Sequence, residues 1–219
     1  MDTKHEKIWR IAKNKLSTSA HGVSHTKRVH ALCKKLADHD TEESILLPAA
    51  LLHDIARAKE DEDDTGEIDH AVLGAEKAEK ILTEENFEKE KIEEIQHCIR
   101  THRFRGNREP ETLEAKILSD ADKLDAIGAV GIGRMFMLAG EFKEKIYRDV
   151  KAEKYVENNM TENGRVVDIS QHSPNLEYEL KLKKIPDRLY TDKAKKIGED
   201  RIAYMDCFFD RLEEEIEGK

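Results

Sequence analysis

The stretch LPAALLHDIA, residues 47–56, is apolar apart from one histidine and one aspartate. The apolar run begins at Ile45, and a helix that is apolar around most of its surface lies in the interior of a protein. His53 and Asp54 therefore fall in the expected core. An ionised carboxylate in an apolar interior is costly unless it is paired, hydrogen-bonded or bound to a metal. This stretch predicts both the centre of the fold and the position of its chemistry.

Helical periodicity extends to both sides of this stretch. Apolar residues recur every three or four positions, and polar or glycine-containing breakers separate the periodic segments. The acidic segment 59–69 has no apolar period, so we expect an exposed loop there. Only residues 166–169 hint at an extended piece. The predicted fold class is all-α, with helices at about residues 2–18, 23–38, 45–56, 70–83, 88–102, 111–126 and from 192 onward.

The length of 219 residues favours a single domain. The helical pattern loosens over about 150–190, which we interpret as a flap or cover. It returns over about 191–217, a C-terminal docking helix with an apolar side formed by Ile197, Met205, Phe208, Leu212 and Ile216. We expect this side to pack within the monomer, and a homodimer is the alternative.

Composition and charge exclude several classes of protein. A formal net charge of −9 disfavours binding to duplex nucleic acid, which needs clustered basic residues. The chain has no signal-peptide core and no apolar run of membrane-spanning length, so we expect a cytoplasmic protein that does not bind membranes. Cys33, Cys98 and Cys207 are widely spaced, which favours buried thiols over disulfides. Gly128, Gly131 and Gly133 follow no strand, so we expect close helix packing there, not a phosphate loop.

Several of the ten histidines share a face with an apolar stripe and are expected to point inward. His25 precedes Val29, Leu32 and Leu36 at helical spacing, His53 sits in the most apolar segment, and His102 follows a stripe of three isoleucines. His70 aligns more weakly with its helix's apolar face, through Gly74 and Ile81. Asp122 lies one turn beyond Leu118, so it is a second carboxylate in an apolar helix.

A single inward histidine is more often a hydrogen-bonded core residue than a metal ligand. The joint pattern favours a metal, because one divalent cation would neutralise Asp54 and Asp122 together. Adjacent residues diverge by about 100° around a helix, so His53 and Asp54 reach one ion only at the helix edge. His25 and Asp122 would complete the site from neighbouring helices.

These residues resemble the HD superfamily of metal-dependent phosphohydrolases, whose pattern of His, His-Asp and a distant Asp matches His25, His53-Asp54 and Asp122. The likeness is greatest to the branch of predicted HD hydrolases of bacteria and archaea. It covers about residues 20–140 and more loosely the C-terminal part. The segments that carry it are HGVSHTKRVHALCKKLA, LPAALLHDIA, HAVLGAEKAEKIL and LEAKILSDADKLDAIGAVGIGRMF.

The resemblance implies a single HD-type domain over residues 1–219, an HD-domain helical bundle with additional C-terminal helices. It makes His25, His53, Asp54 and Asp122 ligands of one metal ion. His70 and His102 occupy the places where dinuclear members carry two further histidines, with Asp54 bridging the ions. Alternatively, these two histidines line a single-metal pocket and meet substrate phosphate or water.

Imidazole and carboxylate ligands suit Mn, Fe, Co, Ni or Zn, and Mg is a less natural choice. A bound ion activates water and polarises a phosphoryl oxygen. We therefore expect one or two divalent ions and a phosphohydrolase, either a phosphomonoesterase or a phosphodiesterase, acting on a small phosphate ester such as a nucleotide. Asp54 and Arg57 are the residues expected to act in catalysis. Further candidates for phosphate contact are Arg28, Arg103, Arg105 and Lys123.

Two other functions remain open. A di-iron HD-type oxygenase would use the same ligand set to activate oxygen. A non-catalytic nucleotide-binding sensor is disfavoured by the complete set of ligands. Retained iron with oxygen consumption would indicate the first, and binding without turnover the second. A purely structural protein would have little reason to bury these four ligands together.

Overall fold

The computed structural model describes residues 3–16, 22–103, 108–161 and 166–219. The chain divides into two compact units, Met1–Asp125 and Ala126–Lys219. Within the described residues every named element is helical, which confirms the all-α prediction. None of the described helices combines the length and apolar character that crossing a bilayer requires. That residues 1–219 form a single HD-type domain stays a prediction.

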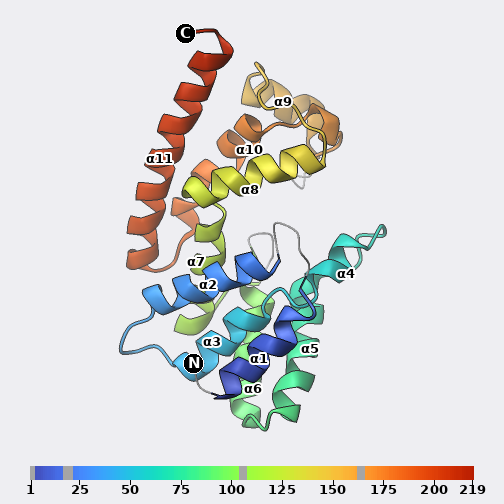
Figure 1. The fold of residues 1–219 in the computed structure, drawn as a ribbon, viewed down its shortest axis with the longest axis vertical. Coiled ribbons are helices and arrows are strands. Elements are labelled where there is room, and N and C mark those ends of the chain that lie inside the picture. Colours follow the sequence, from blue (N-terminus) through green and yellow to red (C-terminus); the bar gives the residue numbers. More distant parts are fainter. Residues whose placement is uncertain (1–2, 17–21, 104–107, 162–165) are drawn as a thin grey trace. The chain divides into compact units, whose positions relative to one another are not determined.

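The first unit is built around the stretch that the sequence marks as its centre (Figure 1). Helix α3 (Glu43–Leu52) is buried at every position from Ile45 to Leu52. It contacts five other helices of the unit, a degree of enclosure expected of an all-round apolar helix. The remaining elements are α1 (Thr3–Lys13), α2 (Val23–Leu36), α4 (Arg57–Asp61), α5 (His70–Glu84), α6 (Lys89–Thr101) and α7 (Leu113–Asp125).

Two boundaries differ from the sequence-based expectation. Helix α3 ends at Leu52, so His53 is its C-cap and Asp54 lies in the turn that follows. The expected loop 59–69 begins inside the short helix α4. Asp69 then caps α5, because its side chain accepts a hydrogen bond from the Ala71 amide. The sequence predicts helix breakers at Ser17-Thr18-Ser19 and over residues 105–110. The first breaker and residues 105–107 of the second lie outside the described residues, and residues 108–110 are not helical.

The second unit contains α8 (Gly128–Glu141), α9 (Ala152–Asn159), α10 (Pro174–Leu180), α11 (Asp192–Ile216) and three short 3-10 helices, Ile169–Gln171, Leu182–Lys184 and Pro186–Arg188. Helix α11 packs against α8. The buried side of α11 includes Met205 as expected, but it continues through Ile202 and Phe209, and Ile216 is exposed. The predicted helix is therefore confirmed. Its buried side shares Met205 with the predicted apolar side but otherwise follows different residues.

The glycines and cysteines give mixed outcomes. Gly128 has a positive φ of 77°, and an added Cβ would lie 2.9 Å from the Arg201 side chain on α11, so helix packing requires glycine there. At Gly131 a Cβ would lie 2.3 Å from the Ala126 carbonyl oxygen, whereas Gly133 faces open space. Cys33 and Cys98 are buried as expected; Cys207 is exposed, contrary to expectation.

Candidate metal centre

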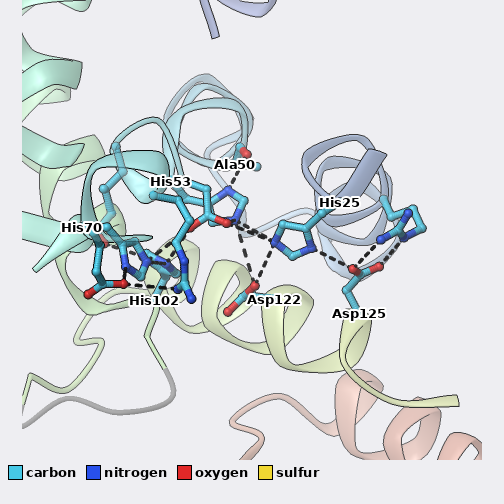
Figure 2. A network of polar contacts seen from close by, with 12 residues as sticks. His25, Ala50, His53, His70, His102, Asp122 and Asp125 are labelled. Carbon is cyan, nitrogen blue, oxygen red and sulfur yellow. Dashed lines mark hydrogen bonds and ion pairs between the residues drawn. The ribbon is translucent and has the colours of Figure 1, made fainter. Parts of the chain in front are cut away.

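The structure brings the six predicted ligands together in the first unit, and Figure 2 labels all of them except Asp54. Five of them are almost completely buried, and the side chain of Asp122 is 24% exposed, which makes it the side of the cluster nearest solvent. They come from α2, the ends of α3 and α6, the start of α5, and α7. The cluster consists of His25, His53, Asp54, His70, His102 and Asp122.

His25, His53 and Asp122 gather at one oxygen of Asp54, a group that we call the first half-site. The Nε2 atoms of His25 and His53 are 3.2 Å apart. Asp54 Oδ2 lies 3.5 Å from Nε2 of His25 and 3.6 Å from that of His53. Asp122 Oδ1 is 3.3 Å from His25 Nε2 and 4.0 Å from His53 Nε2. Four potential ligand atoms therefore face one another.

His70 and His102 gather at the other oxygen of Asp54 and form the second half-site. Their Nε2 atoms are 3.3 Å apart. Asp54 Oδ1 lies 3.2 Å from His70 Nε2 and 3.7 Å from His102 Nε2. Because each carboxylate oxygen of Asp54 faces a different pair of histidines, Asp54 has the geometry of a bridging ligand.

The other ring nitrogen of each histidine is held by an acceptor. His53 and His102 are the C-caps of α3 and α6, and their Nδ1 atoms donate to the carbonyl oxygens of Ala50 and Ile99, at 2.9 and 2.6 Å. Carbonyls in a last helical turn lack helical partners, so a C-cap histidine is well placed to satisfy them. These contacts fix the proton on Nδ1 and leave the Nε2 lone pair facing the cluster.

Carboxylates hold Nδ1 of the other two histidines. His25 Nδ1 donates to Asp125 Oδ2 at 2.7 Å, and His70 Nδ1 donates to Glu60 Oε2 at 2.6 Å. Histidine ligands of metals almost always make such a second hydrogen bond, which fixes the tautomer and the ring orientation. All four imidazoles are therefore oriented with Nε2 toward the cluster.

The donor set fits a divalent cation. Two Nε2 lone pairs at 3.2–3.3 Å repel each other unless a proton or a cation lies between them. Ligand atoms of His25, His53 and Asp122, and likewise of His53, Asp54 and His102, lie within 4.8 Å of one another. Imidazole nitrogen with carboxylate oxygen is a ligand set that suits transition-metal ions.

Local electrostatics set the protonation states. Burial disfavours charge on His25, but its contacts with Asp122 and Asp125 outweigh burial and raise its pKa to about 9. Burial, joined by the nearby imidazoles, lowers the pKa of His53 to about 4. Burial opposes charge on Asp54 as well, yet the surrounding histidines hold its pKa well below the usual range. At neutral pH without metal, His53 is neutral and Asp54 ionised, the forms that bind metal, whereas His25 is protonated and releases a proton when it binds a metal ion.

The candidate phosphate-binding cations lie around the cluster and already have partners. Arg57 contacts Glu60 at 3.4 Å and Asp61 at 3.1 Å, so it reaches the cluster through Glu60. Lys123 donates to the hydroxyl and the carbonyl of Ser119. Arg28 pairs with Asp125 and Arg103 pairs with Glu60 and Asp69. Arg105 lies outside the described residues.

Sequence reasoning missed two acidic residues next to the ligands. Asp125 lies one turn beyond Asp122 on α7 and is buried, and this i, i+3 spacing of carboxylates in an apolar helix was a signal that could have found it. Glu60 gave no comparable signal, because it belongs to an acidic segment that we had interpreted as a solvated loop.

Comparison with known proteins places this cluster in a family. The HD domain family model matches residues 22–127, a range that contains all six clustered residues. The protein YpgQ of Bacillus subtilis (strain 168) is 29% identical over 206 residues, which cover 92% of this chain and 87% of YpgQ. The crystal structure of YpgQ in complex with ADP matches with a TM-score of 0.72 at 27% identity and covers 98% of each chain.

Two further solved structures carry the family name. An HD-superfamily hydrolase from Bacillus thuringiensis is 28% identical with a TM-score of 0.73, over 99% of this chain and 98% of the other. A predicted HD-superfamily hydrolase from an uncultured Thermotogales bacterium is 30% identical with a TM-score of 0.62, over 97% of this chain and 91% of the other. Because the family model includes the whole cluster and these relatives match over nearly their full length, the chain belongs to the HD superfamily.

Proposed function

We propose that the protein is a metal-dependent phosphohydrolase that cleaves a small phosphate ester, with nucleotides as the substrate class. The observation that carries this proposal is the orientation of the Asp54 carboxylate, because each of its oxygens faces a different pair of histidines. Two solved relatives are named hydrolases, and YpgQ binds ADP in its crystal structure. These relatives support a nucleotide as the first substrate to test.

In this proposal the two half-sites hold two divalent ions, Mn, Fe, Co, Ni or Zn, with Mg a weaker choice. His25, His53, Asp54 and Asp122 would hold the first ion, and His70 and His102 would hold the second together with Asp54. When bound, divalent ions lower the pKa of coordinated water and neutralise charge on a phosphoryl oxygen.

The protein's own residues orient and shield the reaction. Burial of five of the six ligands keeps bulk water from the cluster, and the partly exposed Asp122 marks the side from which substrate enters. The Nδ1 contacts prevent the imidazoles from rotating, which holds their Nε2 atoms ready. Arg57 is our candidate for contact with the substrate phosphate, in exchange for its present partners Glu60 and Asp61.

The test is metal content followed by product analysis. Wild type and a His53→Ala, Asp54→Ala double variant are purified, loaded with Mn²⁺ and incubated with a panel of nucleotides and phosphate diesters. We expect bound metal and phosphate-ester cleavage in wild type, and neither in the variant. Chromatography of the products distinguishes a phosphomonoesterase from a phosphodiesterase.

Three results would contradict the proposal. Absence of metal in wild type at saturating Mn²⁺, or equal metal in both proteins, would remove the metal centre. Bound iron with oxygen consumption and no phosphate-ester cleavage would indicate a di-iron oxygenase. Nucleotide binding without turnover in the metal-loaded protein would indicate a sensor.

A further inference from the structure

The two half-sites are oriented by matching contacts of unequal burial. In each half-site, Nδ1 of one histidine donates a hydrogen bond to a backbone carbonyl. Nδ1 of the other donates to a carboxylate that also contacts an arginine. In the first half-site the carboxylate is Asp125, 2% exposed, which accepts two hydrogen bonds from Arg28 at 2.7 and 2.9 Å. In the second it is Glu60, 19% exposed, on the five-residue helix α4.

Glu60 gathers three donors on one carboxylate. Its Oε2 accepts from His70 Nδ1 at 2.6 Å and lies 3.4 Å from Arg57 Nη1. Its Oε1 accepts from Arg103 Nη1 at 2.9 Å. Burial disfavours its charge, but His70 and the two arginines outweigh burial and lower the pKa of Glu60 below its ordinary value. An ionised Glu60 is thus the common partner of His70, Arg57 and Arg103.

The same contacts fix the start of α5, where His70 is the first residue. Arg103 Nη1 also contacts Asp69 Oδ1 at 2.9 Å, and Arg108 donates to Asp69 Oδ2 at 3.0 Å. Asp69 in turn caps α5. His70 is therefore oriented through its ring by Glu60 and through its backbone by Asp69, and Arg103 joins these two carboxylates.

We propose that Glu60 is the positioning residue that controls occupancy of the second half-site. It orients His70 toward the second ion, so its loss lowers the affinity for that ion. The affinity for the first ion stays the same, because Asp125 orients His25. This inference rests on the proposed function. Because the carboxylate of Glu60 is 19% exposed and that of Asp125 is 2% exposed, we also expect the second half-site to be the weaker one in wild type.

The experiment uses the metal-depleted full-length chain and titrates it with Mn²⁺ in a calorimeter. Glu60→Gln keeps the shape of the side chain and an oxygen for His70 but removes the charge. Wild type is expected to bind two ions. In Glu60→Gln the affinity for one ion should fall about 10- to 100-fold, with the other unchanged. The matched control is Glu62→Gln on the same segment, whose carboxylate is 66% exposed and pairs with Lys59; it should bind both ions as wild type does.

A spectroscopic readout separates positioning from general damage. At two equivalents of Mn²⁺, the electron paramagnetic resonance spectrum of wild type should show a coupled pair, and that of Glu60→Gln an isolated ion. Arg103→Gln removes one of the two arginines that contact Glu60. It should lower the affinity for the same ion by a smaller factor. This second variant keeps the test usable if Glu60→Gln folds poorly, which its thermal melting curve reports.

The outcomes distinguish this inference from the proposed function. Two ions bound to Glu60→Gln with wild-type affinities, or equal weakening of both ions, would overturn the role of Glu60 and leave the phosphohydrolase proposal intact. Wild type that binds no Mn²⁺ at all would refute the proposed function itself.

Discussion

The metal centre of the first unit and the hydrogen-bonded cluster around His172 in the second unit differ in what their histidine nitrogens face. In the second unit His172 is 7% exposed, and each of its nitrogens has its own protein partner. The Tyr155 hydroxyl donates to Nδ1 at 2.8 Å, and Nε2 donates to Glu177 at 3.3 Å. One neutral tautomer satisfies both contacts. In the metal centre, by contrast, Nδ1 is satisfied and Nε2 faces another Nε2.

This difference separates a structural histidine from a candidate ligand. Asn159 donates to the Tyr155 hydroxyl at 3.0 Å, so the hydrogen-bond chain around His172 is complete without an ion. In the metal centre the Nε2 atoms converge instead on one another and on the carboxylates of Asp54 and Asp122, which is the arrangement expected around a cation. We expect variants in the two clusters to separate metal binding from stability.

The largest effect is expected for Asp54→Ala, because it removes a ligand oxygen from both half-sites. Loss of an outer contact to a metal ligand costs about 10- to 100-fold in affinity, so loss of the bridging ligand should cost more than roughly 100-fold. Metal content after dialysis should fall to background, measured by mass spectrometry of the metal. Asp54→Ala that retains two ions per chain would make Asp54 a structural residue.

Asp125→Asn should have the next largest effect, and only in the first half-site. The amide keeps the shape of the side chain but leaves Arg28 without its charged partner. Affinity for one Mn²⁺ ion should fall about 10- to 100-fold in a calorimetric titration. If the affected ion is the one that Glu60→Gln weakens, then the division into two half-sites is wrong.

Apolar periodicity predicted the centre of the fold and the inward position of five of the six clustered residues. The place of His70 in the cluster, and the role of His70 and His102 as further ligands, followed from the resemblance to the HD superfamily. Ile45–Leu52 is buried throughout, as its composition requires. The exact end of α3 was not predictable, since the apolar run continues through Ile55 and Ala56 beyond the last helical residue, Leu52. Glu60 was missed because its contact with His70, ten residues away, leaves no trace in the local pattern of an acidic segment.

His172→Gln tests the hydrogen-bonded cluster of the second unit, which we expect to contribute to stability and not to metal binding. It removes the ring that joins Tyr155 to Glu177, and a broken buried hydrogen-bond pair costs about 1–3 kcal/mol. We expect thermal unfolding at lower temperature with two Mn²⁺ ions still bound, as in wild type. Loss of metal in the folded His172→Gln protein would show that the two clusters are not independent.

The smallest effect is expected in the acid stability of the metal-free protein. Burial disfavours charge on Glu177, but Lys181 and His172 outweigh burial and lower its pKa to about 2, from an ordinary value of 4.5. The unfolded chain therefore takes up the proton first, so the stabilisation is complete above pH 4.5 and is lost as the pH falls toward 2. The difference in melting temperature between wild type and Glu177→Gln should shrink over that interval; a constant difference would contradict this.

The most direct test of the metal centre is anomalous X-ray diffraction at the manganese edge from crystals grown with Mn²⁺. We predict one peak among His25, His53 and Asp122 and a second between His70 and His102, with Asp54 contributing one oxygen to each. The exposed group Asp38, His39 and Asp40 is the natural comparison site, since it also meets the distance criterion for a cation. Peaks at that surface group with none in the cluster would contradict the account.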